Sequence, residues 1–226
     1  MERELAEGLW TFDGGMIRFL TFPYRLRMTV VRLSDGSLFV CSPVELTDGL
    51  AREVDALGPV RHIATPNKQH HLFLDPWKRA YPDALLWAPP GLADKRDDFD
   101  FDGELRDRPD RAWGRDLDQR VVRGSWFMDE VVFLHRASRT LILGDLIENH
   151  EPRDLSPLRR AVARAGRMFG ETPTAYRLTF SDKHRAGETL REVLDWRPER
   201  VVVAHGPIIE RDVDATLRKA FAWATG

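Results

Sequence analysis

The stretch Glu130-Val-Val-Phe-Leu-His135, Arg136-Ala-Ser-Arg139, Thr140-Leu-Ile-Leu-Gly-Asp145 decides the fold. Two apolar runs, rich in residues that favour strands, flank four residues suited to a turn, and this pattern predicts an antiparallel hairpin. The second run ends in a carboxylate, Asp145. Because ligands of open α/β sheets bind beyond the carboxyl ends of the strands, Asp145 is a candidate site residue.

Two other apolar strands of the sequence also end in side chains that can bind a metal. Val60–Thr65 leads into a loop that contains His70 and His71, and Val201–Ala204 is followed directly by His205. Taken singly, a histidine pair in a loop is usually a surface feature, and a histidine after a buried strand is often a hydrogen-bonded core residue. Their shared position at strand ends favours one common site, and imidazoles with a carboxylate suit zinc, iron or manganese.

The composition limits the class of protein. A chain of 226 residues that is 42% hydrophobic can bury a real core, and we expect a single domain over residues 1–226. Its formal net charge of -2 argues against a nucleic-acid partner, because phosphate binding depends on accumulated basic charge. Cys41 is the only cysteine, which excludes an internal disulfide and a thiolate-rich metal site.

Hydropathy predicts neither a membrane segment nor a secretion signal. No apolar run approaches the roughly 20 residues that a membrane-spanning helix needs, and the charged N-terminus lacks the apolar stretch of a signal peptide. We therefore expect a cytoplasmic protein with no membrane partner, acting on a small-molecule substrate or ligand. The sequence does not indicate the oligomeric state.

The N-terminal part is predicted to be rich in strands. Leu9–Phe12 is a short strand that Gly14 and Gly15 are expected to end, and residues 28–33 and 37–41 form a hairpin. A helix is expected from about Thr47, because apolar residues recur at helical spacing until Gly58.

Residues 93–111 differ in composition from the rest of the chain. They are rich in charged residues and show little apolar periodicity, which predicts a solvated surface loop rather than a charged lid. Phe99 and Phe101 are suited to anchor this loop against the body of the protein.

A later helix is predicted from Ser156-Pro157 to Gly170, with serine as N-cap and proline at the first helical position. Its predicted buried stripe consists of Leu158, Ala161, Val162, Ala165, Met168 and Phe169. Arginines on the opposite face suit solvent, although a membrane or a phosphate would also suit them.

Taken together, these motifs resemble those of the metallo-β-lactamase superfamily. The resemblance rests on the loop from Thr65 to His71, the strands that lead to Asp145, and Val-Val-Val-Ala-His205-Gly. His-His-Leu-Phe at 70–73, Tyr-Pro-Asp-Ala at 81–84 and Ala-Pro-Pro-Gly-Leu at 88–92 resemble its uncharacterised DUF4336 branch. The resemblance implies an α/β (α+β) fold: a four-layer αββα sandwich with a metal site along one edge, between the two sheets.

The chain departs from the superfamily's loop motif, Thr-His-x-His-x-Asp-His. Pro66 and Lys68 stand where the first two histidines belong, His70 replaces the aspartate, and the third histidine of the first metal position falls near Trp126. The resemblance therefore implies that the first metal position is lost.

The second metal position keeps four residues that can ligate. The resemblance assigns them as His70, His71, Asp145 and His205, which implies one divalent transition metal, with zinc expected and iron or manganese as alternatives. Lys68, near the lost position, either replaces part of the missing charge or binds an anionic group, or else points to solvent. Glu130 is a candidate general base or supporting carboxylate, with a surface glutamate at a strand start as the alternative.

These residues predict a metal-dependent, hydrolase-like protein that acts on an ester, lactone, amide or phosphodiester. Pro66, Lys68 and Trp126 support the alternative of a non-catalytic member that binds a ligand or partner. Oxidoreductase chemistry at iron also occurs in the superfamily, but it uses a fuller ligand set than this one.

Overall fold

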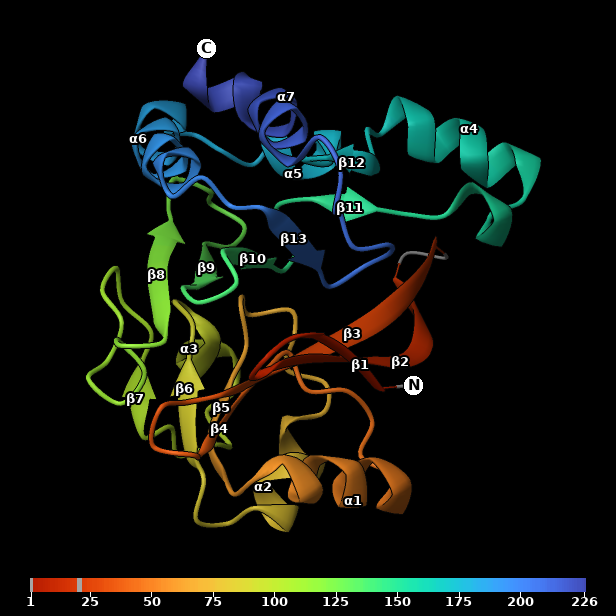
Figure 1. The fold of residues 1–226 in the computed structure, drawn as a ribbon. Coiled ribbons are helices and arrows are strands. Elements are labelled where there is room, and N and C mark those ends of the chain that lie inside the picture. The colour runs from red at the N-terminus through yellow and green to blue at the C-terminus, as the bar shows by residue number, and fades with distance from the viewer. Residues whose placement is uncertain (1, 20–21) are drawn as a thin grey trace.

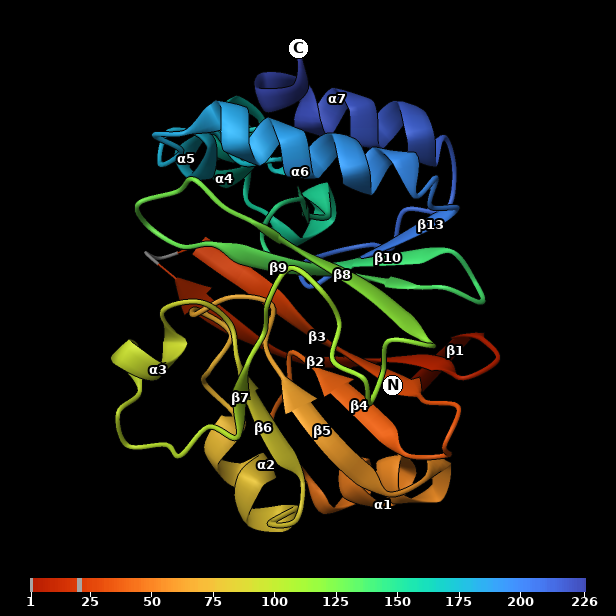
Figure 2. The same cartoon turned by 90° about the vertical axis from the view of Figure 1, so that its left-hand side faces the viewer.

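The computed structural model describes residues 2–19 and 22–226, and it arranges them in four layers. Figures 1 and 2 show two sheets face to face, with α1 and α2 covering the outer face of one and α6 and α7 covering the other. This is the predicted αββα sandwich.

The first sheet has seven strands in the order β1-β2-β3-β4-β5-β6-β7. The β1–β4 part is antiparallel, whereas β4, β5, β6 and β7 run parallel to one another. The strands are β1 (Glu2–Ala6), β2 (Leu9–Phe19), β3 (Phe22–Arg32), β4 (Leu38–Cys41), β5 (Val60–Ala64), β6 (Leu85–Ala88) and β7 (Gly103–Glu104).

The second sheet has the order β13-β10-β9-β8, and β10 and β13 are parallel. Its strands are β8 (Leu117–Val122), β9 (Glu130–His135), β10 (Thr140–Leu143) and β13 (Arg200–Val203). The predicted hairpin is β9 and β10, which pair antiparallel. A small separate sheet joins β11 (Glu148–Asn149) and β12 (Phe169–Glu171).

Along the chain, most of the helices connect one strand to the next. They are α1 (Asp48–Leu57), α2 (Leu74–Ala80), α3 (Leu92–Lys95), the 3-10 helix η1 (Pro152–Asp154), α4 (Pro157–Ala165), α5 (Thr174–Arg177), α6 (Lys183–Asp195) and α7 (Val213–Thr225). The Ser156 side chain caps α4, as predicted, and the Thr47 side chain caps α1.

Apolar side chains fill each of the three spaces between the layers. Met28 and Trp77 belong to the cluster under α1 and α2, Phe39 and Phe133 to the cluster between the sheets, and Phe221 to the cluster under α6 and α7. Burial on both faces explains why β9 and β10 are continuous apolar runs rather than alternating ones.

The prediction that Gly14 and Gly15 end the second strand is wrong. Strand β2 continues to Phe19, and its register with β3 shifts between Asp13 and Met16, as in a β-bulge. A Cβ at Gly14 would lie 2.7 Å from Val44 Cγ1, so the glycine permits close packing of β2 against the segment that follows β4.

The helix predicted over 156–170 is shorter, and its apolar stripe is not buried. Helix α4 ends at Ala165, and only Ala163 is buried in it. Leu158 is 76% exposed and Val162 54% exposed. Periodicity predicted the helix correctly but not its partner, because α4 lies beside the sandwich rather than over a sheet (Figure 1).

Residues 93–111 lie at the surface, and most of their charged side chains are exposed. Phe99 and Phe101 are half-buried against the cluster under α1 and α2, and Leu105 is buried between the sheets. Within the described residues, no helix is long and apolar enough to cross a membrane.

Two helical glycines should respond oppositely to alanine. At Gly187 in α6, a Cβ would lie 2.2 Å from the main-chain oxygen of Ala224 in α7, whereas at Gly49 in α1 the nearest atom is 3.8 Å away. We expect Gly187→Ala to lower the free energy of unfolding by about 1–3 kcal/mol through overpacking. Gly49→Ala should raise it by up to about 1 kcal/mol through helix propensity. Urea unfolding measures both changes, and a stabilised Gly187→Ala variant would contradict the close packing of α6 and α7.

Candidate metal centre

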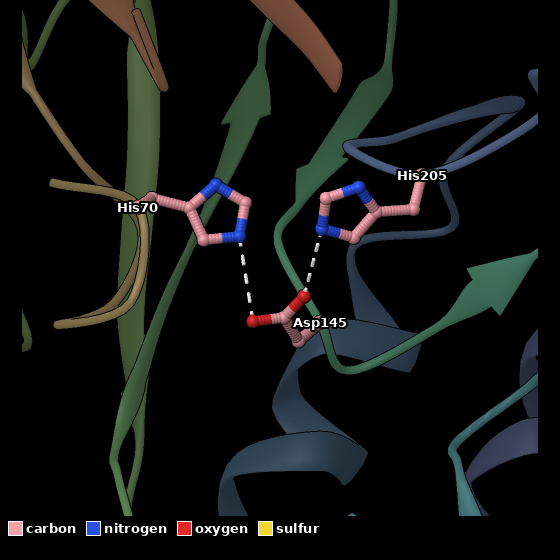
Figure 3. A group of neighbouring side chains, drawn as sticks. All are labelled: His70, Asp145 and His205. Atoms are coloured by element: carbon pink, nitrogen blue, oxygen red, sulfur yellow. Dashed lines mark ion pairs between the residues drawn. The ribbon is translucent and has the colours of Figure 1, made fainter. Parts of the chain in front are cut away.

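Three side chains that can bind a metal converge at one edge of the sandwich. His70, Asp145 and His205 each offer a ligand atom, and these atoms lie within 4.8 Å of one another (Figure 3). His70 Nε2 is 3.3 Å from Asp145 Oδ2, and His205 Nε2 is 3.1 Å from Asp145 Oδ1. The topology explains the convergence, because β10 and β13 are parallel and end at the same edge.

Glu130, at the start of β9, fixes the loop that carries Asp145. Its side chain is fully buried, and its two oxygens accept hydrogen bonds from the main-chain N–H groups of residues 144, 145 and 146, at 2.9, 2.7 and 3.2 Å. The surface-glutamate alternative is therefore wrong. A Cβ at Gly144 would lie 3.1 Å from Glu130 Oε2 and 2.9 Å from Pro66 Cγ, which explains the glycine at this position.

Asn67 links Glu130 to Asp145, a role that the sequence analysis missed. It is fully buried, and its Nδ2 donates to Glu130 Oε2 at 3.0 Å and to Asp145 Oδ2 at 2.9 Å. Its Oδ1 accepts from Gln69 N at 2.9 Å, which also shapes the loop before His70. An asparagine after a buried strand signals a turn of this kind, but its contact with residue 130 leaves no local signal.

Both imidazoles of the cluster are held by Nδ1 and turn Nε2 toward Asp145. His205 Nδ1 lies 2.7 Å from Arg25 O, and since a carbonyl only accepts, this nitrogen carries a proton. His70 Nδ1 lies 2.6 Å from the hydroxyl of Ser42, which follows β4 and has a positive φ of 58°. Metal-binding histidines are typically oriented in this way, by a partner on the other ring nitrogen.

Electrostatics couple the three side chains. Burial raises the pKa of Asp145, but the charges and hydrogen bonds of His70 and His205 outweigh it and hold this pKa well below its ordinary value. Burial lowers the pKa of His205, but its hydrogen bond with Asp145 and the charge of that carboxylate raise it above the ordinary value. The site thus favours the ionised form of the Asp145 carboxylate.

The structure does not bring His71 into this cluster. Its Nδ1 lies 3.0 Å from Arg96 Nη1, and since a guanidinium only donates, this ring nitrogen is the acceptor. Burial, followed by the positive charges of Lys95 and Arg96, lowers the pKa of His71. As placed, its accepting lone pair is used by Arg96, so the predicted set of four ligands is reduced to three.

Two of the residues that replace the first metal position, Lys68 and Trp126, do not belong to this cluster. Trp126 is 71% exposed, and the half-buried Lys68 has its Nζ 5.9 Å from the centre of the Phe127 ring. Lys95 Nζ donates to Lys68 O at 3.0 Å, which places a second ammonium nearby. Within residues 2–19 and 22–226, the three-residue cluster is the one group with metal-binding geometry.

Glu130 does not have the geometry of a general base that contacts a substrate. Burial, followed by the charge of Asp145, raises its pKa to about 7, while hydrogen bonds from residues 145, 67 and 146 act in the opposite direction. Because all its acceptor positions face the protein, the geometry supports a positioning role.

The comparisons with known proteins agree with this architecture. Residues 6–94 match the family model described as a domain of unknown function, DUF4336. This part of the chain contains His70 but neither Asp145 nor His205. A search among curated proteins finds no match.

Solved metallo-β-lactamases match nearly the whole chain. The DIM-1 enzyme exposed to ceftazidime has a TM-score of 0.69 at 13% identity, covering 98% of this chain and 96% of that one. The enzyme from Pontibacter korlensis gives 0.68 at 11% identity, covering 98% of each chain. FIM-1 from Pseudomonas aeruginosa, in its mono-zinc form, gives 0.67 at 10%, covering 100% of this chain and 96% of that one. This chain therefore has the metallo-β-lactamase fold.

Removing the Glu130 carboxylate should strongly destabilise the protein. Glu130→Ala leaves buried N–H donors without an acceptor, so we expect the free energy of unfolding to fall by about 3 kcal/mol or more. The control, Glu45→Ala, changes an exposed glutamate and should shift it by less than about 0.5 kcal/mol. Equal effects in urea unfolding would contradict the positioning role.

Proposed function

We propose that the protein binds one divalent transition metal through His70, Asp145 and His205 and uses it in a hydrolase-like reaction. The observation that carries this proposal is the convergence of two Nε2 atoms and one carboxylate, with ligand atoms within 4.8 Å, at the edge of a metallo-β-lactamase fold. Three protein ligands with a free position are typical of catalytic zinc sites.

The donor set fits such a metal chemically. Two imidazoles and one carboxylate suit zinc, with iron and manganese as alternatives. Asp145 is 14% exposed at its side chain, so the site is shielded from bulk water yet can be reached by a ligand. Asn67 and the loop bound by Glu130 orient Asp145. The Ser42 hydroxyl orients the His70 ring, and the main-chain carbonyl of Arg25 orients the His205 ring.

A divalent metal in such a site supplies Lewis acidity to a carbonyl or phosphoryl oxygen and to water. The chain's own contribution is orientation and the exclusion of water. The Tyr24 ring packs edge-on against the His205 ring, with 5.0 Å between the centroids, and closes one side of the site. Hydrolysis of an ester, lactone, amide or phosphodiester is the reaction class that this arrangement supports best.

Metal binding should distinguish the two neighbouring histidines. We expect about one metal per chain in the untagged protein after supplementation with zinc, iron or manganese, its loss in His70→Ala, and its retention in His71→Ala. Because the two residues are adjacent, each variant is the matched control for the other. Elemental analysis measures the metal. An unsubstituted protein that stays metal-free, or a His71→Ala variant that alone loses metal, would contradict the proposed ligand set.

The Ser42 hydroxyl should tune metal affinity without being a ligand. Loss of the partner that orients His70 is expected to weaken metal binding about tenfold or more in Ser42→Ala. The control, Ser181→Ala, removes an exposed hydroxyl whose hydrogen bond, to Gly124 O, lies outside the site. Competition with a chromophoric chelator gives the dissociation constants for the metal. Equal constants for the two variants would mean that packing alone orients His70.

A substrate panel separates an enzyme from a ligand-binding protein of the same fold. Metal-loaded protein should hydrolyse at least one ester, lactone, amide or phosphodiester, and His70→Ala should not. Full metal occupancy without turnover of any compound would favour the non-catalytic alternative.

A further inference from the structure

An apolar cavity of about 550 Å³ opens directly onto the candidate metal centre. Asp145 and His205 line it, so a molecule inside would touch two of the three proposed ligands. This volume falls in the range of small-molecule sites, about 300–1,000 Å³.

Three segments that are distant in the sequence build the apolar walls. The β2–β3 hairpin contributes Ile17 and Phe22, the segment before β9 contributes Phe127, and α4 with the residues after it contributes Val162 and Met168. Both views show the hairpin and α4 at the same end of the molecule (Figures 1 and 2). Of the apolar stripe predicted for this helix, Val162 and Met168 therefore form part of the cavity wall, whereas Leu158 lies outside it.

The charges at the cavity disfavour an anionic occupant. Its ionisable lining consists of Asp145, Glu148 and His205 at one end, together with the aromatic hydroxyls of Tyr24 and Tyr176. All lining residues belong to the described part of the chain, and none is lysine or arginine. In the metal-free protein, a carboxylate or phosphate in the cavity would therefore meet carboxyl groups and, among the lining residues, no cationic side chain apart from the His205 ring.

We propose that the cavity binds the apolar chain of a neutral acyl compound (an ester, lactone or amide) and places its carbonyl at Asp145 and His205. This inference rests on the proposed function for its chemistry, but binding of the apolar chain needs no metal. The proposal concerns esters, lactones and amides rather than phosphodiesters, because the apolar walls away from the metal centre carry no lysine or arginine to pair with a phosphodiester.

Binding to metal-free protein tests the proposal separately from catalysis. The probes are methyl ketones of five to eleven carbons, with carboxylates and alkyl phosphates of the same lengths, in isothermal titration calorimetry after chelator treatment. We expect ketone affinity to rise about two- to fourfold per methylene, with the matched anions at least tenfold weaker. Anions that bind as tightly as ketones, or no dependence on chain length, would overturn the proposal.

Two substitutions on α4 provide a matched pair. Val162→Glu places a charge on the cavity wall, and Leu158→Glu places the same charge on the same helix, outside the lining. We expect ketone affinity to fall at least fivefold in the first variant and to stay unchanged in the second. Equal effects would overturn the assignment. The assignment would also be overturned if the protein bound no ketone and formed a dimer that Val162→Glu dissociates, because a second copy would then cover this face.

If metal fails to bind but ketones bind as expected, the acyl-chain assignment of the cavity is supported and the proposed function is contradicted. If metal binds and ketones do not, the metal centre stands and the acyl-chain assignment fails.

Discussion

The site depends on one buried carboxylate that is not itself a proposed ligand. Glu130 accepts hydrogen bonds from three consecutive main-chain N–H groups and from Asn67, so it organises the loop after β10 and the loop after β5 together. These two loops come from different sheets. A carboxyl group this deeply buried is tolerated only when its acceptor positions are satisfied, so the same hydrogen bonds that stabilise Glu130 also fix the position of Asp145.

From Glu130 the arrangement extends outward through further hydrogen bonds. Asn67 restrains the Asp145 carboxylate, Ser42 and a main-chain carbonyl restrain the two rings, and Arg27 donates to the main-chain oxygens of Val203 and Gly206 on either side of His205. The three side chains of the cluster are therefore held by others outside it, which is the arrangement expected of a preorganised site.

The resemblance to the metallo-β-lactamase superfamily implied the sandwich. The three converging strand ends were predicted from the residues themselves, because apolar strands followed by polar residues carry a local signal. The sequence did not distinguish His70 from His71, since the choice depends on Arg96, which lies 25 positions away. The roles of Asn67 and Ser42 depend likewise on contacts between distant segments. For α4, periodicity indicated an apolar face but not what that face covers, and the structure places a cavity there.

The hydrogen bond between His205 and Arg25 joins residues 180 positions apart, and Asn67 and Asp145 are separated by 78. Contacts of such large sequence separation carry a cost in loop-closure entropy. The first half of the chain therefore cannot assemble the cluster before the last strand has docked. A ligand bound by all three side chains would stabilise only the completed sandwich. Its binding would therefore raise the free energy of unfolding by linking segments from the two halves of the chain.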